Sequence, residues 1–315
     1  MGNEIQAEKE GLLFGLNTPG GTGALRLASD FLKTFTPNSS IWISDPSWPN
    51  HKSIFEASGF QVKSYPYFDA DNNNVDFDSL ISQIKEIPRK DIVVIHGCCH
   101  NPTGSDLSKE QWSTLADIIL EKELLPICDF AYQGLGNGIE EDAAGVRILT
   151  KKLKELIICT SFSKNFGLYS ERVGSLIFFS ESAQSSASVL SQLKKTARSN
   201  YSNPPAHGSD IVKTILNNSE LRSAWIAELD KVRGRIRDVR ASLVDQLLEE
   251  GCKRDFSFIK NQNGMFSFTG LTPEQVSLLK ENYSIYLVNS GRINVAGITS
   301  HNINYVAKAI NEVIK

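Results

Sequence analysis

Apolar segments of two kinds alternate along the first two thirds of the chain. Continuous apolar runs such as 92–97 are typical of strands buried on both faces, whereas apolar residues over 109–123 have the spacing of an amphipathic helix. Strands that alternate with helices of this length predict a mainly parallel sheet covered on both faces. Further strands are expected over 41–44, 60–67, 124–134, 156–161 and 172–179, and further helices over 24–33, 50–58, 77–87 and 183–197.

The pattern changes after residue 200. A loop over 200–208 precedes a long helix over 219–250, which is rich in Arg and Glu and is expected to expose those charges to solvent. We therefore predict a large domain over 1–232 and a small α+β domain over 233–315, joined near the middle of the long helix. The small domain is expected to contain helices over 273–282 and 300–314.

Composition is that of an ordinary soluble globular protein, with 41% hydrophobic and 22% charged residues. The net charge of -3 gives no reason to expect nucleic acid or an anionic membrane as a partner. The five cysteines have no C-x-x-C spacing, which indicates buried thiols in a reducing compartment and no metal site. No apolar run approaches transmembrane length and the first residues are too polar for a signal peptide, so a cytoplasmic protein is expected.

Candidate chemistry lies where the predicted strands end. The run 156–161 leads directly to Lys164, and a lysine brought by a buried strand to the edge of a sheet loses hydration. Loss of hydration lowers the pKa of the amine, which can then form a Schiff base, although a lone lysine in this place is usually just solvated. Ligands of such sheets bind outside the carboxyl ends of the strands. The other candidates at those ends are Trp48, His51, Asn101, Asp129 and Tyr132.

A glycine-rich turn over 18–23 opens the helix predicted over 24–33. Backbone N–H groups at the positive end of a helix dipole can bind a phosphate. The alternative is a turn that uses glycine only for its backbone angles. No G-x-G-x-x-G follows the first predicted strand, which disfavours a dinucleotide-binding fold.

Eight motifs occur in one order along the chain: P-G-G-T-G-A-L, W-P-N-H, C-C-H-N-P-T-G, D-F-A-Y-Q-G, S-x-S-K-N-F-G, E-R-V-G, Y-S-N-P-P-A-H-G and G-R-I-N-V-A-G. With this set the chain closely resembles the class I aminotransferases, specifically the aspartate aminotransferase group and its aromatic-aminotransferase sisters. The resemblance runs from about Leu13 to the C-terminus. It implies a three-layer α/β fold of the fold-type-I transferases and pyridoxal 5'-phosphate as cofactor.

The resemblance implies three catalytic residues. Lys164 matches the lysine that holds the cofactor as a Schiff base and moves the proton between the substrate α-carbon and the cofactor. Asp129 matches the carboxylate that keeps the pyridine nitrogen protonated, and His51 matches the residue that orients this carboxylate. Tyr132 matches one of two residues that hydrogen-bond the phenolic oxygen of the cofactor.

Further contacts with the cofactor and substrate are implied in the same way. Asn101 matches the second residue at the phenolic oxygen, and Trp48 matches the ring that stacks on the pyridine; both also border the substrate. Arg292 matches the arginine that clamps the substrate α-carboxylate. Arg198 matches the one that reaches the distal carboxylate across the interface of a homodimer. The implied phosphate site comprises the backbone of Gly21 and Thr22 with the side chains of Ser161 and Arg172.

The implied activity is transfer of the amino group of L-aspartate to 2-oxoglutarate in a ping-pong reaction, in which the cofactor alternates between its pyridoxal and pyridoxamine forms. Thr22, Asn203 and the run S-K-N-F-G-L-Y favour aspartate, and an aromatic amino acid is the alternative substrate. Family members carry a long N-terminal portion before the phosphate-binding turn, whereas about seventeen residues precede Thr18 here. A relative that folds or binds the cofactor without turnover is therefore the second alternative.

Overall fold

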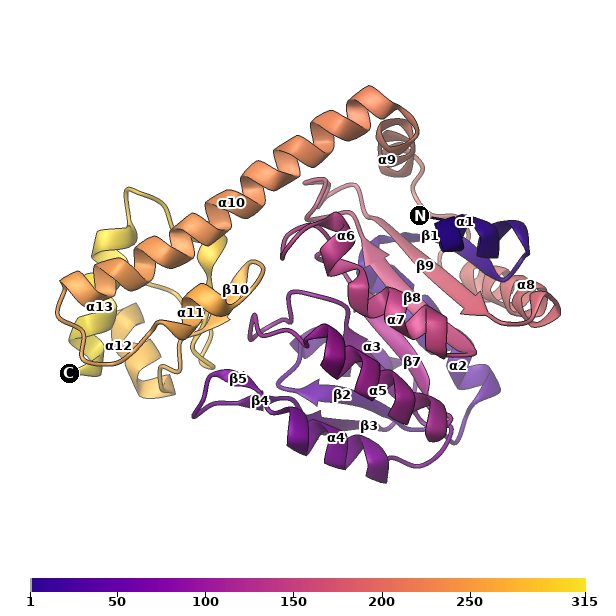
Figure 1. Ribbon diagram of the computed structural model, residues 1–315, viewed down its shortest axis with the longest axis horizontal. Coiled ribbons are helices and arrows are strands. Elements are labelled where there is room, and N and C mark those ends of the chain that lie inside the picture. The colour runs from indigo at the N-terminus through magenta and orange to yellow at the C-terminus, as the bar shows by residue number, and fades with distance from the viewer. Residues whose placement is uncertain (1) are drawn as a thin grey trace.

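A mainly parallel sheet forms the centre of the larger part of the computed structural model, which describes residues 2–315 (Figure 1). Within this range the sheet has seven strands, which lie side by side in the order β1 (Leu13–Pro19), β9 (Val173–Ser180), β8 (Glu155–Ser161), β7 (Leu125–Phe130), β6 (Ile92–His96), β2 (Ile41–Asp45) and β3 (Val62–Pro66). β9 runs antiparallel to β1 and β8, and all other neighbours pair in parallel. The prediction of a mainly parallel sheet is confirmed.

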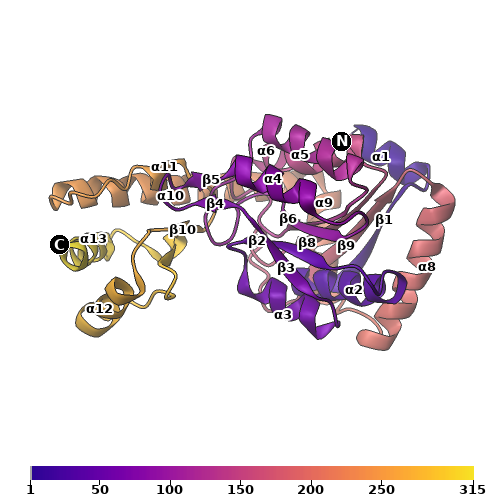
Figure 2. The same cartoon turned by 90° about the horizontal axis from the view of Figure 1, so that it is seen from below.

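Helices cover both faces of this sheet, which gives three layers (Figure 2). One face carries α2 (Gly20–Phe35), α3 (Pro49–Ala57) and α8 (Ala183–Asn200), and the other carries α4 (Phe77–Glu86), α5 (Lys109–Glu121) and α7 (Ala144–Lys152). Along β6, Ile92 and Val94 pack on the side of α2, whereas Val93 and Ile95 pack on the side of α5. Successive side chains of a strand point to opposite faces, so a continuous apolar run fills both cores.

Five helices were not predicted from the pattern: α7, α1 (Gly2–Lys9), α6 (Ile139–Asp142), α9 (His207–Asn217) and α11 (Phe258–Asn261). α7 contains Gly145, and glycine is unfavourable inside a helix. In the structure a side chain at this position would collide with the ring of Trp112 in α5, so close contact between the two helices requires glycine. α9 shortens the loop predicted over 200–208, because the helix already begins at His207.

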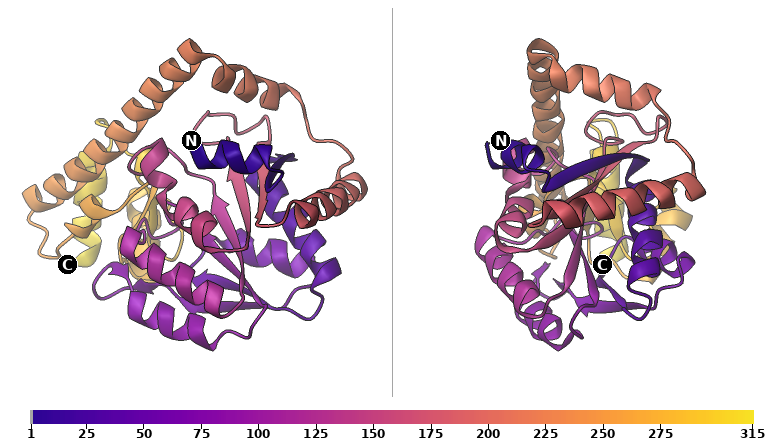
Figure 3. Two further views of the ribbon diagram at one scale, coloured as in Figure 1. Left: turned by 45° about the vertical axis from the view of Figure 1, so that its right-hand side comes forward. Right: turned by 90° about the vertical axis from the view of Figure 1, so that its right-hand side faces the viewer.

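The C-terminal part of the chain has its own core. α10 (Ser219–Glu249) connects the two groups of elements and is the longest helix in Figures 1 and 3. Leu229 of α10 packs against the sheet side, whereas residues from Ile236 onward join the C-terminal cluster. The elements of this cluster are α11 (Phe258–Asn261), β10 (Phe266–Phe268), α12 (Pro273–Tyr283), β11 (Arg292–Asn294), the 3-10 turn η1 (Val295–Gly297) and α13 (Ile303–Ile314).

The remaining elements are small and peripheral to the sheet. α1 (Gly2–Lys9) precedes β1, and β4 (Phe68–Asp69) pairs with β5 (Asn74–Val75) in a two-stranded hairpin. Among residues 2–315, none of the helices combines the length and the apolar composition needed to cross a membrane.

Candidate active site

A cavity of about 320 Å³ lies at the carboxyl ends of the parallel strands and reaches the C-terminal part of the chain. Lys164 follows β8, Asp129 belongs to the end of β7, and Arg292 begins β11, so the lining comes from both cores. Parallel neighbours end at the same edge of a sheet, which explains why residues far apart in sequence meet here. Ten of the predicted residues line this cavity: Gly21, Thr22, Trp48, Asn101, Asp129, Tyr132, Ser161, Lys164, Arg172 and Arg292.

The amine of Lys164 lies 4.7 Å from the centre of the Tyr132 ring. Burial is the main cause that lowers the pKa of Lys164, because it disfavours the ammonium form. The positive charge of Arg172 lowers the pKa further, and the carboxylate of Asp129 opposes both effects. Lys164 and Asp129 therefore share one cavity and influence each other electrostatically.

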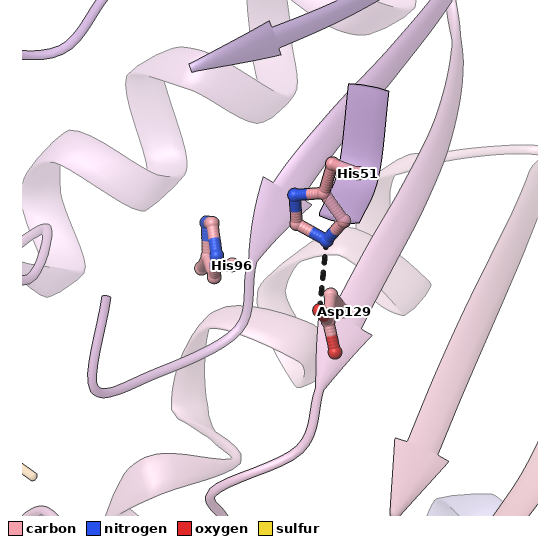
Figure 4. Close-up of side chains that lie close together, drawn as sticks. All are labelled: His51, His96 and Asp129. Carbon is pink, nitrogen blue, oxygen red and sulfur yellow. Dashed lines mark hydrogen bonds and ion pairs between the residues drawn. The ribbon is translucent and has the colours of Figure 1, made fainter. Parts of the chain in front are cut away.

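Asp129 is held from behind by His51, a residue of α3 (Figure 4). His51 Nε2 lies 2.9 Å from Asp129 Oδ2, and His51 Nδ1 lies 2.9 Å from Ser47 Oγ. Burial acts to raise the pKa of Asp129, but the hydrogen bond from His51 and the electrostatic effects of His51, His96 and Lys164 outweigh it and lower the pKa. The carboxylate is consequently an anion at neutral pH.

His96 was not predicted as a site residue, although it ends β6 and lines the cavity. Its ring lies between those of His51 and His100, with centroids 5.0 Å and 4.3 Å away. Neither ring nitrogen has a hydrogen-bond partner among the described residues. Burial, helped by the charge of His51, lowers the pKa of His96 to about 3, so the ring is neutral at physiological pH.

Asn101 connects the sheet side of the cavity to the C-terminal part. Its Oδ1 accepts a hydrogen bond of 3.1 Å from Arg292, and its Nδ2 donates one of 3.3 Å to the Tyr132 hydroxyl. The guanidinium of Arg292 also lies 4.4 Å from the centre of the Phe266 ring. Burial, with the negative charge of Asp129, raises the pKa of Tyr132, and the bond from Asn101 opposes this rise.

The start of α2 forms a narrow corner of the cavity. A side chain at Gly20, where φ is +73°, would collide with the guanidinium of Arg172. A Cβ atom added to Gly21 would lie 3.1 Å from Ser161 Cβ, so this position leaves little room for a side chain and Gly20 requires glycine. No side chain caps this end of α2, which leaves the first backbone N–H groups available to an anion.

Two predicted residues do not line the cavity. His51 lies behind Asp129, as expected for a residue that orients the carboxylate. Arg198 is exposed on α8 and is not among the lining residues of its own chain. His51, His96 and Asp129 approach one another within 4.8 Å, a spacing compatible with a metal ion, but both nitrogens of His51 already contact Asp129 and Ser47.

Sequence reasoning missed several lining residues for different reasons. Ser163 stands in the S-x-S-K motif beside Ser161, so the motif itself offered a signal for it. His96 belongs to an apolar run, so the sequence does not mark it. It lies at the site because it is paired with Asp129 on the adjacent strand β7. Tyr169 ends the run S-K-N-F-G-L-Y, which offered a signal, whereas Phe266 carries no polar group that would mark it in the sequence.

The chain is similar in sequence and in structure to known proteins. The profile of the family described as aminotransferase class I and II matches residues 3–310. The chain is 52% identical to an aspartate aminotransferase of Escherichia coli, covering 94% of this chain and 75% of that protein, and 47% identical to an aromatic-amino-acid aminotransferase of Pseudomonas aeruginosa, covering 94% and 74%. A crystal structure of an aromatic-amino-acid aminotransferase from Burkholderia pseudomallei, covalently bound to pyridoxal phosphate, superposes with a TM-score of 0.96 at 47% identity, covering 99% and 77% of the two chains.

Proposed function

Because this chain belongs to the class I and II aminotransferase family, we propose that it transfers the amino group of L-aspartate to 2-oxoglutarate with pyridoxal 5'-phosphate as cofactor. The chain has the three-layer fold of the fold-type-I transferases. The observation that carries the proposal is that Lys164, Asp129 and Arg292 line one cavity. An amine, a buried anion and a carboxylate-binding cation are the groups that a transamination requires.

The residues present fit the proposed cofactor. The buried anion Asp129 suits a protonated pyridine nitrogen, and the amine of Lys164 suits an aldehyde. The corner at Gly20 and Gly21, which any side chain would fill, suits a phosphate together with Ser161 and Arg172. Pyridoxal phosphate, when bound, supplies a ring that accepts electrons from the substrate α-carbon and stores the amino group between the two half-reactions.

The residues of the chain would divide the remaining work. Lys164 would take the proton from the substrate α-carbon and pass it to the cofactor, because its lowered pKa leaves a larger share of neutral amine. Asp129 holds a proton on the pyridine nitrogen, and His51 fixes the direction of the Asp129 carboxylate. Tyr132 and Asn101 donate hydrogen bonds to the phenolic oxygen of the ring, while Asn101 remains bonded to Arg292.

Substrate selection would depend on two arginines and a tryptophan. Arg292 and Trp48 line the cavity, where Arg292 would bind the α-carboxylate in a forked hydrogen bond and Trp48 would hold the cofactor ring from one side. We propose that Arg198 reaches the distal carboxylate in the cavity of a partner subunit, so that the active form is a homodimer. This proposal is supported by the exposure of Arg198 and by the fact that it does not line the cavity of its own chain.

We further propose a domain boundary between residues 232 and 233 and a cytoplasmic location. The boundary is supported by α10, where Leu229 packs with the sheet and Ile236 packs with the C-terminal cluster. The location is supported by five free, buried cysteine thiols, because compartments that favour disulfides rarely leave so many unpaired.

The test is the absorbance of the chain loaded with pyridoxal phosphate, recorded before and after addition of aspartate. We expect a visible band that shifts to shorter wavelength with aspartate and returns with 2-oxoglutarate, together with release of oxaloacetate. Parallel measurements with phenylalanine and tyrosine should give a lower kcat/KM than aspartate; the reverse order would favour the aromatic alternative. Binding without a spectral shift would reduce the chain to a cofactor-binding relative.

A further inference from the structure

The carboxylate of Asp106 organises the loop that carries Asn101. Asp106 Oδ2 accepts a hydrogen bond of 2.9 Å from the backbone N–H of Cys99, and Oδ1 accepts one of 2.8 Å from that of His100. Cys99 has a φ of +50°, a left-handed conformation that is costly for a residue with a side chain. The two bonds to Asp106 therefore hold a strained turn immediately before Asn101.

Asp106 also accepts a hydrogen bond from the C-terminal part of the chain. Asn263, which follows α11, donates from Nδ2 to Asp106 Oδ2 at 3.2 Å, and its backbone N–H donates to Gly104 O at 2.7 Å. A Cβ atom at Gly104 would lie 2.6 Å from Phe266 O, so the backbones of the loop and of β10 are in direct contact. The loop of Asn101 is thus attached to the C-terminal part at two adjacent points.

On the far side of Asn263 lies Arg240 of α10, whose residue surface is only 1% exposed. Its guanidinium donates to the carbonyls of Ile259, Asn263, Gly264 and Phe266 at distances from 2.8 to 3.3 Å, and also to the hydroxyl of Ser267. No carboxylate lies within ion-pair distance of this guanidinium in the described part of the chain. Burial lowers the pKa of Arg240 to about 10, so the group remains a cation at neutral pH.

Asn263 separates this cation from the carboxyl group of Asp106. Its backbone carbonyl faces Arg240 at 3.3 Å, and its side-chain N–H faces Asp106. The carbonyl of Asn263 thus accepts from the Arg240 guanidinium, and its amide donates to the Asp106 carboxyl group. Buried polar groups that have hydrogen-bond partners cost less free energy to bury. Arg240 also holds Phe266 and Ser267 of β10, and β10 pairs with β11 through Phe268 and Arg292.

We propose that Asp106, Asn263 and Arg240 form a positioning relay that sets the distance between Asn101 and Arg292 and so determines how tightly the substrate α-carboxylate is bound. Asp106 fixes the turn of Asn101, and Arg240 fixes the strand pair that presents Arg292. Asn263 joins the two across the junction of the cores. The inference rests on the proposed function, because it assigns the α-carboxylate to Arg292.

The test uses Asn263→Ala in the cofactor-loaded chain, with Asn311→Ala as the matched control. Asn311 is a buried asparagine that, like the half-buried Asn263, has one side-chain hydrogen bond, of 2.7 Å to Glu250 O, but both partners lie in the C-terminal part. We expect Asn263→Ala to weaken binding of succinate, a dicarboxylate without an amino group, by about tenfold, the loss expected for one hydrogen bond to a charged group. KM for aspartate should rise similarly, with little change in kcat or cofactor binding, and Asn311→Ala should change neither constant.

Two further measurements separate the relay from a general loss of stability. Amide exchange at Cys99 and His100 should be faster in Asn263→Ala than in Asn311→Ala, even when both variants unfold at the same urea concentration. Asp106→Asn combined with Asn263→Ala should weaken succinate binding no more than the stronger single change, because both break one connection. Additive effects, or equal exchange in the two asparagine variants, would overturn the relay. If wild type failed to bind succinate, the proposed function would fail, and the exchange measurement would still decide the relay.

Discussion

The Nε2 atom of His51 lies 2.9 Å from the Oδ2 atom of Asp129, and both side chains are buried. Ser47 contacts the other ring nitrogen of His51, so the ring has a fixed orientation. An N–H group at Nε2 can donate to the carboxylate, while the serine hydroxyl contacts Nδ1. Asp129 therefore carries the negative charge and His51 fixes its direction, so substitution of each residue tests a different contribution.

Asp129→Asn should lower kcat/KM for aspartate by at least about a hundredfold, because it removes a preorganised charge. His51→Asn keeps that charge and loses only its orientation, for which a loss of about tenfold is expected. Steady-state kinetics at saturating cofactor compares the two variants. An equal loss in both would show that orientation, and not charge, is what matters, and unchanged kinetics in Asp129→Asn would remove this residue from the mechanism.

Lys164→Ala should abolish turnover, with a loss of about 10⁴-fold or more, because no other amine lines the cavity in the described residues to carry the proton. Phosphate contacts through Ser161 and Arg172 should still give weak cofactor association. Equilibrium dialysis and the oxaloacetate assay measure the two properties separately. Lys154→Ala is the control, since Lys154 is exposed and its contact with Glu181, 3.7 Å long, lies away from the cavity. Normal turnover in Lys164→Ala would refute the role assigned to this amine.

Much of the cavity could be predicted because strand ends converge by geometry. Asp129 and Lys164 each follow an apolar run, and neighbouring parallel strands must deliver their ends to one edge. The resemblance then supplied residues from the other core, such as Arg292, whose place periodicity alone does not determine. The fold was predictable for the same reason: continuous apolar runs need cover on both faces.

Other features depend on contacts that no local pattern contains. Asp106 looks like an ordinary loop acid, and its importance comes from Asn263, which is 157 residues away. Gly145 looks like a helix breaker until the ring of Trp112 is placed against it. Arg198 is exposed in a single chain, so its proposed role requires a second subunit that the sequence of one chain cannot position.

His96 should make the protein sensitive to mild acid. Its pKa is about 3 in the folded chain and near 6.5 when unfolded. Between these values the unfolded chain binds a proton that the folded chain does not, so the free energy of unfolding falls as pH decreases, by up to about 1.4 kcal/mol per pH unit from this group. The contribution is fully present above the unfolded value and is lost as pH falls toward the folded one.

The measurement is urea unfolding of the cofactor-free chain between about pH 7 and pH 5, in wild type and His96→Phe. We expect His96→Phe to flatten the dependence on pH without abolishing it, because burial also lowers the pKa of His100. His301→Phe, a change at an exposed histidine, should leave the slope unchanged. Identical slopes in wild type and His96→Phe would contradict the assignment.

The proposed role of Arg198 predicts complementation between two inactive variants. Arg198→Ala retains Lys164 and lacks the distal arginine, whereas Lys164→Ala retains Arg198 and lacks the amine. In a mixed dimer, one cavity combines Lys164 of the first variant with Arg198 of the second, and the other cavity has neither. Random exchange of subunits in an equal mixture should therefore restore about a quarter of the wild-type activity per chain, because half of the dimers contain one intact site.

Mixing is carried out after mild dissociation and refolding, and activity is followed with aspartate, since loss of the distal arginine should matter most for a dicarboxylate. Lys164→Ala mixed with the double variant Arg198→Ala/Lys164→Ala is the control and should stay inactive, because no cavity regains an amine. Activity in the first mixture but not in the control would require Arg198 to act on the partner's site. No recovery, although mixed dimers are detected by mass spectrometry, would mean that Arg198 serves its own chain or has no role in the reaction.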